Sequence, residues 1–230
     1  MGQRGTKPQC SVSTKWTPEL AYAVGLLVTD GCLSKDGRHI DFTSKDKKLV
    51  LTFCRCLKLK NSIGRKTSGY TGRKDHFRVQ FGDVSFYDWL VAIGLSPHKS
   101  RSLKGIEIPD SLFFDFIHGC FDGDGTIYSF WDRRWTDSFM FYIAFASGSN
   151  EFLLWMRGKL KNLLEIKGHI SSGTRNTFQL KYAKRESILL FRRMFYAKEI
   201  PHLARKRLKA QNIFNIHARV VDRNKLARVL

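Results

Sequence analysis

The chain contains the same short pattern twice, and this repeat constrains the fold more than any other feature. Residues 21–31 and 116–125 each form an apolar run of helical character that ends in Asp-Gly. Each run carries small residues four positions apart: Gly25 and Thr29 in the first copy, Gly119 and Gly123 in the second. Residues four apart lie on one face of a helix. The repeat therefore predicts two helices that pack closely through these small residues, with their final aspartates side by side.

The final aspartates, Asp30 and Asp124, would occupy an unfavourable place for structural carboxylates. A helix C-terminus carries partial negative charge, which disfavours an anion by roughly 0.3–1 kcal/mol. A second carboxylate nearby adds repulsion. We therefore expect a divalent metal between them, with Mg²⁺ as the natural candidate, since it is usually held by one or two carboxylates together with phosphate and water.

The charge of the chain points to a polyanionic partner. Forty Lys and Arg residues face 20 Asp and Glu residues, which gives a formal net charge of +20. No run approaches the ~18 apolar residues of a membrane-spanning helix, so nucleic acid is the predicted partner and a membrane is not. The five cysteines have no paired spacing, which predicts an intracellular protein, in a bacterial or archaeal cytoplasm or an organelle matrix.

The order of elements also repeats. Each half reads as a motif helix, a hairpin, a helix, a second hairpin and a closing helix, with further helices expected over 45–60 in the first half and 185–198 in the second. The fold class is predicted as α+β, a pseudo-symmetric duplication of αββαββα with two saddle-shaped antiparallel sheets under the central helix pair. The expected divisions are a basic leader 1–16, a first half 17–94, a linker 95–108, a second half 109–200 and a basic, partly helical tail 201–230.

The expected strands alternate apolar and polar residues, so each sheet should have one core face and one polar, basic face. Such a saddle suits double-stranded DNA, because β-ribbons can enter the major groove; a merely solvated sheet face is the plainer alternative. The candidate DNA-binding residues of the first half are Lys35, Arg38, His39, Thr43, Lys66, Ser68, Tyr70, Arg73, Lys74, His76, Arg78 and Gln80. Those of the second half are Tyr128, Arg133, Arg134, Ser138, Met140, Tyr142, Lys167, His169, Ser171, Arg175, Asn176, Thr177, Gln179 and Lys181.

At the two motif copies the chain resembles the LAGLIDADG homing endonucleases, in their single-chain form with two motifs. The copies align as residues 23–31 and 117–125. The second copy keeps Gly119, Asp122, Gly123, Asp124 and Gly125 of the motif. The first copy keeps Gly25, Leu26, Asp30 and Gly31, and has Val28 where the motif has its earlier acid.

The resemblance implies a monomeric, intron-encoded, sequence-specific endonuclease that hydrolyses one phosphodiester in each strand of a long DNA site. Asp30 and Asp124 would hold Mg²⁺ or Mn²⁺, with the backbone carbonyls of Thr29 and Gly123 as further ligands. Ca²⁺ would bind without supporting cleavage.

The resemblance also assigns roles beyond the motif. Lys99 and Lys206 follow the closing helix of each half, where the family places a lysine that reaches toward the active site. Asp41 matches a polar position near the scissile phosphate, but its counterpart Ala144 cannot hydrogen-bond a water, so we expect the two DNA strands to be cut with unequal ease.

One alternative stays open at this point. A non-cleaving protein with the same fold, either an RNA splicing maturase or a transcription regulator, would share these elements, and intron RNA is then a further partner. Retention of both Asp-Gly endings favours catalysis.

Overall fold

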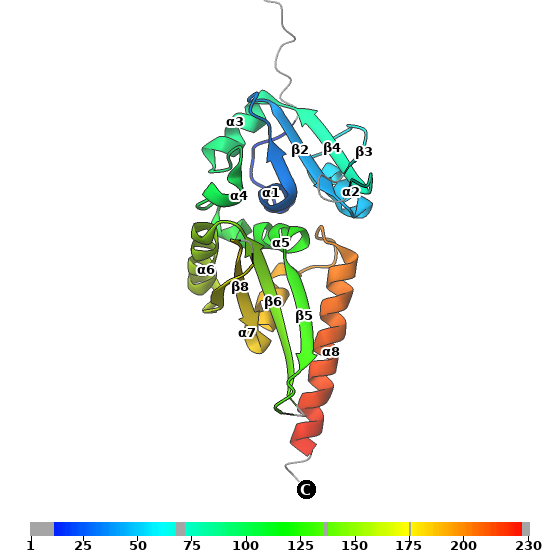
Figure 1. Ribbon diagram of the computed structural model, residues 1–230, viewed down its shortest axis with the longest axis vertical. Helices are drawn as coiled ribbons and strands as arrows, with labels where there is room; N and C mark the ends of the chain where they lie inside the picture. Colours follow the sequence, from blue (N-terminus) through cyan, green and yellow to red (C-terminus); the bar gives the residue numbers. More distant parts are fainter. Residues whose placement is uncertain (1–11, 68–71, 136–137, 175, 227–230) are drawn as a thin grey trace, which may run out of the picture.

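The computed structural model describes residues 12–67, 72–135, 138–174 and 176–226. It consists of two units of helices and strands that meet where helix α1 lies against helix α5 (Figure 1). The predicted basic leader falls mostly outside the described residues. None of the described helices is both long enough and apolar enough to cross a membrane.

The first unit contains the following elements: α1 (Pro18–Asp30), β1 (Gly31–Leu33), β2 (His39–Ser44), α2 (Lys47–Cys56), β3 (Gly64–Lys66), β4 (His76–Gly82) and α3 (Val84–Ala92). A short helix α4 (Lys99–Ser102) and a 3₁₀ turn (Asp110–Leu112) lead into the second unit. That unit contains α5 (Phe113–Gly123), β5 (Thr126–Trp131), β6 (Phe139–Ser147), α6 (Asn150–Leu164), β7 (His169–Ser172), β8 (Phe178–Ala183) and α7 (Lys184–Met194). The chain continues as α8 (Ala204–Leu226).

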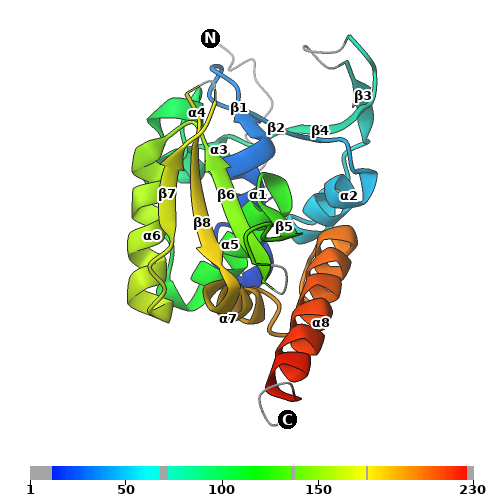
Figure 2. The same cartoon turned by 60° about the horizontal axis from the view of Figure 1, so that its bottom comes forward.

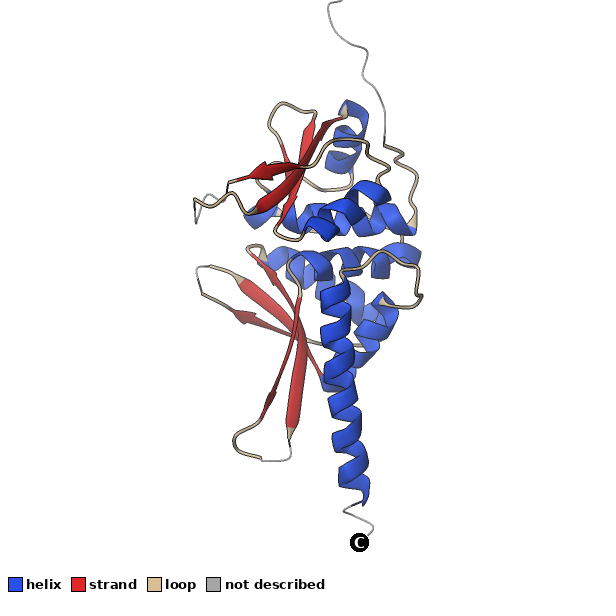
Figure 3. Cartoon of the chain, turned by 90° about the vertical axis from the view of Figure 1, so that its right-hand side faces the viewer, coloured by secondary structure: helices blue, strands red, loops and turns tan. Residues whose placement is uncertain are grey.

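The two sheets have the same topology, with strand orders β1-β2-β4-β3 and β5-β6-β8-β7. All neighbouring strands are antiparallel, and the register also agrees between the units. Asp41 stands opposite Gln80 in the first sheet, and Ala144 stands opposite Lys181 in the second. The predicted α+β duplication is confirmed, and Figure 3 shows the two sheets splayed on one side of the helix pair.

Local sequence explains where the helices begin and end. Thr17 caps α1, because its side chain accepts a hydrogen bond from the Leu20 amide, and Asp46 caps α2 in the same way. Asp46 thus delays the start of the helix expected over 45–60, and Lys58, in a left-handed conformation with φ 54°, prevents its continuation. The helix expected over 185–198 ends at Met194, after which Phe195 leaves helical geometry.

The helix pair is as close as its small residues predict. A Cβ atom on Gly25 would lie 2.2 Å from the Phe116 carbonyl oxygen, and one on Gly119 would lie 2.1 Å from that of Tyr22. Both contacts are with backbone, so no side chain can replace these hydrogens without separating the helices. One turn later, a Cβ on Gly123 would collide with Thr29 Oγ1 at 2.0 Å.

Helix α8 packs on the core face of the second sheet. The Phe214 ring makes edge contacts with Phe141 and with Phe191, at centroid distances of 5.5 Å and 5.0 Å. Figure 2 shows the beginning of α8 beside α2, and an ion pair between Arg205 and Asp46 at 3.4 Å joins them. The tail helix therefore connects both units.

Candidate active site

Asp30 and Asp124 end the two central helices as neighbours. Asp30 is half-buried as the last residue of α1, and Asp124 is the exposed C-cap of α5. Desolvation and the charge of Asp124 raise the pKa of Asp30 to about 6, although Lys206 and Lys99 oppose this rise. Desolvation also raises the pKa of Asp124. The two carboxylates therefore form a site of incompletely compensated negative charge.

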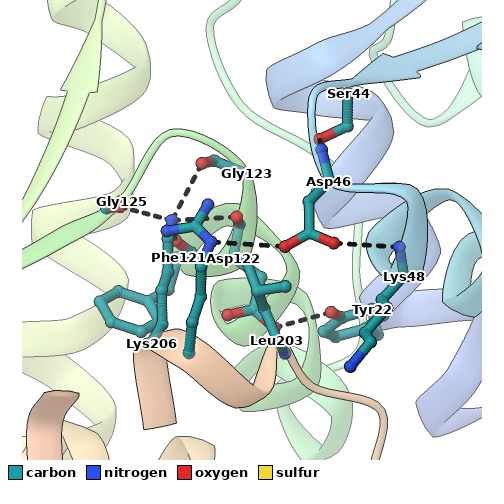
Figure 4. A network of polar contacts seen from close by, with 11 residues as sticks. Tyr22, Ser44, Asp46, Lys48, Phe121, Asp122, Gly123, Gly125, Leu203 and Lys206 are labelled. Atoms are coloured by element: carbon teal, nitrogen blue, oxygen red, sulfur yellow. Dashed lines mark hydrogen bonds and ion pairs between the residues drawn. The ribbon is translucent and has the colours of Figure 1, made fainter. Parts of the chain in front are cut away.

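Lys206 brings a buried cation from α8 to the C-terminus of α5. Its Nζ lies within hydrogen-bond distance of four carbonyl oxygens, those of Asp122 at 2.9 Å, Gly123 at 3.0 Å and Gly125 at 2.6 Å and that of Phe121, which share its three N–H donors (Figure 4). Burial lowers the pKa of Lys206 to about 8. This cation satisfies carbonyl groups that a helix end leaves without partners.

Lys99 makes the corresponding contact in the first unit. Its buried Nζ donates to the carbonyl oxygen of Gly31, and Gly31 follows Asp30 as Gly125 follows Asp124. Burial lowers the pKa of Lys99. Lys99 and Lys206, the two lysines that the sequence analysis placed near the active site, therefore supply part of the positive charge beside Asp30.

The donor set fits a hard divalent cation. In the described part of the chain, no group of three or more His, Cys, Asp or Glu side chains could hold a metal ion. Two carboxylates that keep a raised pKa beside two lysines match Mg²⁺ or Mn²⁺, which can complete their coordination with water and phosphate. The Gly123 carbonyl, a predicted ligand, already accepts a hydrogen bond from Lys206, so only its second lone pair is open to a metal.

Asp41 and Arg78, predicted for different roles, bind each other. Arg78 Nη2 donates to a carboxylate oxygen of the buried Asp41 at 2.9 Å. Asp41 also lies near enough to Lys99 to raise its pKa. In the second unit the register places Ala144 and Gln179 at the equivalent positions, so this pair has no counterpart there.

The other DNA-binding candidates of the first unit lie along the polar face of its sheet and in the adjoining loops. His39 pairs with Asp36, and His76 pairs with Asp75 at 2.7 Å. The following are exposed: Lys35, Arg38, Lys66, Arg73, Lys74 and Gln80. Thr43 is half-buried, and Ser68 and Tyr70 lie outside the described residues.

The candidates of the second unit form a different surface. Tyr128 and Tyr142 stack with ring centroids 5.5 Å apart, and Arg134 pairs with Asp132 at 2.8 Å. The following are exposed: Arg133, Lys167, His169 and Asn176. The following are half-buried: Ser138, Met140, Ser171, Thr177, Gln179 and Lys181. Arg175 lies outside the described residues.

Sequence reasoning missed the anchoring role of Asp122. This buried carboxylate accepts from the Tyr22 hydroxyl at 2.7 Å and from the Leu203 amide at 2.6 Å (Figure 4). It therefore joins α1, α5 and the residue that precedes α8, three positions before Lys206. One feature of the sequence could have indicated this role: the second motif copy has an acid at this position, whereas the first copy has Val28.

Comparison with known proteins identifies the fold. No protein-family model and no curated protein sequence matches the chain. Solved structures do match. One is the N-terminal LAGLIDADG domain of DUF199/WhiA, which is 17% identical with a TM-score of 0.53. The match covers 81% of this chain and 86% of that one.

Two DNA-bound endonucleases are similarly close. I-DmoI in complex with DNA and Mn is 15% identical with a TM-score of 0.52, and the match covers 79% of this chain and 98% of that one. The LAGLIDADG homing endonuclease I-LtrWI bound to target DNA is 12% identical with a TM-score of 0.57, and the match covers 86% and 89%. The chain thus has the two-unit LAGLIDADG fold, which occurs both in endonucleases and in DUF199/WhiA.

Proposed function

We propose that the protein is a divalent-metal-dependent endonuclease that binds a long duplex DNA site and hydrolyses one phosphodiester in each strand. One observation carries this proposal. Asp30 and Asp124 lie together at two helix ends, and the pKa of Asp30 stays raised to about 6 beside two buried lysines. A site that retains this excess negative charge is suited to a divalent cation.

Asp30 and Asp124 would hold the metal in their deprotonated state. Mg²⁺ or Mn²⁺ at this place supplies polarisation of the phosphate and a more acidic water. The backbone carbonyls of Thr29 and Gly123 remain candidate ligands next to the two carboxylates. We expect Ca²⁺ to occupy the site without supporting cleavage.

Lys99 and Lys206 would stabilise the charge that develops on the phosphate. Both ammonium groups are already held by carbonyl oxygens, so each acts as a positioned charge that needs no reorganisation during the reaction. With a pKa of about 8, Lys206 is mostly protonated at neutral pH. Asp41 would orient a water in the first unit only, since Ala144 cannot do so.

Charge and shape support duplex DNA as the ligand. The net charge is +20, and the two sheets open on one side of the helix pair (Figure 3). Structural neighbours such as I-LtrWI are described bound to target DNA. Both carboxylates come from one chain, so a monomer would suffice, as expected for an intron-encoded homing endonuclease.

The proposal can be tested with a randomised duplex library incubated with Mg²⁺, Mn²⁺ or Ca²⁺, followed by sequencing both of the cut ends and of the intact duplexes that the protein retains. We expect cuts at one sequence family with Mg²⁺ or Mn²⁺, and binding alone with Ca²⁺. Asp30→Asn should bind the selected site without cutting it. Asp88→Asn, which changes an exposed carboxylate on α3, is the matched control and should cut normally.

A second candidate is a binding protein that does not cut, and the match to DUF199/WhiA favours it. The two candidates differ in one outcome of the same experiment. A wild-type chain that selects a duplex sequence but leaves it intact with both Mg²⁺ and Mn²⁺ would replace the endonuclease proposal. In a parallel selection from a randomised RNA library, tight binding of one RNA family by a chain that selects no duplex would indicate a splicing cofactor.

A further inference from the structure

The polar face of the second sheet carries a row of three aromatic rings. Tyr128 and Tyr142 stand opposite each other on β5 and β6, with an interplanar angle of 19°. Phe130 continues the row beyond Tyr142, with a centroid distance of 6.2 Å and an interplanar angle of 10°. Phe130 ends the row and is 45% exposed. The three rings are therefore nearly parallel, and one ring is open to solvent.

Basic side chains share a hollow with this row. The rings border a hollow of about 510 Å³, whose other walls include Lys167, His169 and Lys181. The one carboxylate in its wall, Glu186, accepts from the backbone amide of Lys167 at 2.7 Å. The hollow thus combines aromatic faces with cationic groups, which is the composition that binds a base and its phosphate.

An intact duplex cannot use these ring faces. Its bases are stacked on one another and show only their edges in the grooves. Parallel aromatic rings on an open antiparallel sheet instead provide stacking surfaces for unpaired bases. The row therefore fits a ligand in which at least one base is unstacked.

The fold itself does not require the row. The registers place Ser34 and His39 in the first unit where the second has Tyr128 and Tyr142, because Leu33 pairs with Ile40 as Ile127 pairs with Ile143. Strand β1 ends at Leu33, so this unit has no strand position that corresponds to Phe130. The rings are a feature of one unit, which favours a specific ligand over a general structural need.

We propose that the row Tyr128, Tyr142 and Phe130 binds an unpaired nucleotide of a single-stranded nucleic acid. The base stacks on the open face of Phe130, and Lys167 and Lys181 contact the adjoining phosphates. This binding goes beyond the proposed cleavage of duplex DNA, which needs neither an unpaired base nor Phe130. RNA and single-stranded DNA share the chemistry that the site recognises.

The test measures binding of the full chain to fluorescent oligonucleotides by anisotropy, in EDTA so that no strand is cut. The ligands are oligo(U), oligo(dU), an abasic strand of the same length and a duplex. We expect the wild type to bind the base-bearing strands about 5–100-fold more tightly than the abasic strand. Whichever of oligo(U) and oligo(dU) binds more tightly identifies the source, and equal affinities assign the site to both.

Variants separate stacking from charge. Phe130→Leu should lose most of the difference in affinity between base-bearing and abasic strands, while its affinities for the abasic strand and for the duplex stay unchanged. Phe130→Tyr should keep the difference between base-bearing and abasic strands. Trp131→Leu is the matched control, because Trp131 is 49% exposed but packs on the core residue Phe139. Equal binding of base-bearing and abasic strands, or an equal loss of duplex binding in Phe130→Leu, would overturn the proposal. Failure of duplex cleavage would not affect it, since cleavage plays no part in this measurement.

Discussion

The two units share a strand order and a register but present different chemistry on their polar faces. In the first unit His39, His76 and Arg78 each pair with a carboxylate of the same unit. In the second unit the corresponding face carries the aromatic row and the basic hollow. The duplicated backbone thus fixes where side chains stand, while the residue at each of these positions differs between the units.

The same difference divides the candidate active site. Among the residues that the structure describes, Lys99 donates to one carbonyl oxygen, that of Gly31, whereas Lys206 lies within hydrogen-bond distance of four at the end of α5. Asp122 anchors the segment before Lys206, and the first motif has Val28 at the matching position. Conversely, the first unit has a carboxylate, Asp41, at the position where the second unit has the apolar residue Ala144. The two halves of the candidate site are therefore related in backbone and different in the side chains around the two aspartates.

The largest expected effect tests whether both units contribute to one site. Asp30→Asn and Asp124→Asn should each reduce cleavage of both strands by at least about 100-fold, because removal of one electrostatic group commonly costs this much. Duplex affinity, measured in Ca²⁺, should stay near that of the wild type. Loss of cutting in only one strand would show two independent sites and break the comparison.

The seam between the units should be almost as sensitive. Gly119→Ala places a methyl group 2.1 Å from the Tyr22 carbonyl oxygen, so the helices must separate at a cost of about 1–3 kcal/mol. A shift of about 1 Å in the catalytic groups would reduce cleavage by about 100-fold. Gly158→Ala in α6 is the control, because among the described residues no atom outside the adjoining backbone of its own helix lies within 4 Å of the added methyl group. Gly158→Ala should leave stability unchanged or raise it slightly. Similar losses of cleavage and stability in Gly119→Ala and Gly158→Ala would show that the effect is not specific to the contact between α1 and α5.

The anchor of α8 offers a prediction that applies to the second unit alone. Asp122→Ala removes the acceptor for Tyr22 and Leu203 and should lower the free energy of unfolding by about 1–3 kcal/mol. Cleavage should fall further than this loss of stability explains, because Lys206 follows Leu203 by less than one helical turn. Asp122→Asn keeps an acceptor oxygen and should restore most of the activity. Denaturant unfolding and cleavage rates measured on the same samples separate the two effects.

The smallest expected effect concerns pH. The pKa of Asp30 is raised from 3.8 to about 6 in the folded state, so the folded protein holds this proton more tightly than the unfolded chain. Its contribution to stability is complete below about pH 4 and is lost as the pH rises through about 6. Without metal, the free energy of unfolding of the wild type should fall as the pH rises from about 4 to above 6. In Asp30→Asn this fall should be smaller by about 1–2 kcal/mol.

The matching measurement is cleavage by the wild type in Mg²⁺. Because the metal needs the deprotonated carboxylate, the rate should increase as the pH rises through about 6. Stability that does not differ between wild type and Asp30→Asn across this range would mean that the lysines compensate the carboxylates fully.

The amino-acid sequence alone determined the duplication, the helix pair and the alternating faces of the strands. These features depend on short periods: small residues four apart at Gly25 and Gly119, and alternation such as Phe139, Phe141 and Ile143. Such a period favours one conformation and places the apolar or small residues on one face of it. The positions of Asp30 and Asp124 followed from the same local pattern.

The tertiary structure alone decided which distant side chains meet. Arg78 donates to Asp41, Asp122 joins Tyr22 to Leu203, and Arg205 pairs with Asp46. These contacts join residues far apart in the chain, and packing of whole elements selects the rotamers that make them. No local period encodes the choice of rotamer. The sequence therefore shows Asp122 only as an acid of the motif, and its role as the anchor of the segment before α8 becomes visible only in the folded structure.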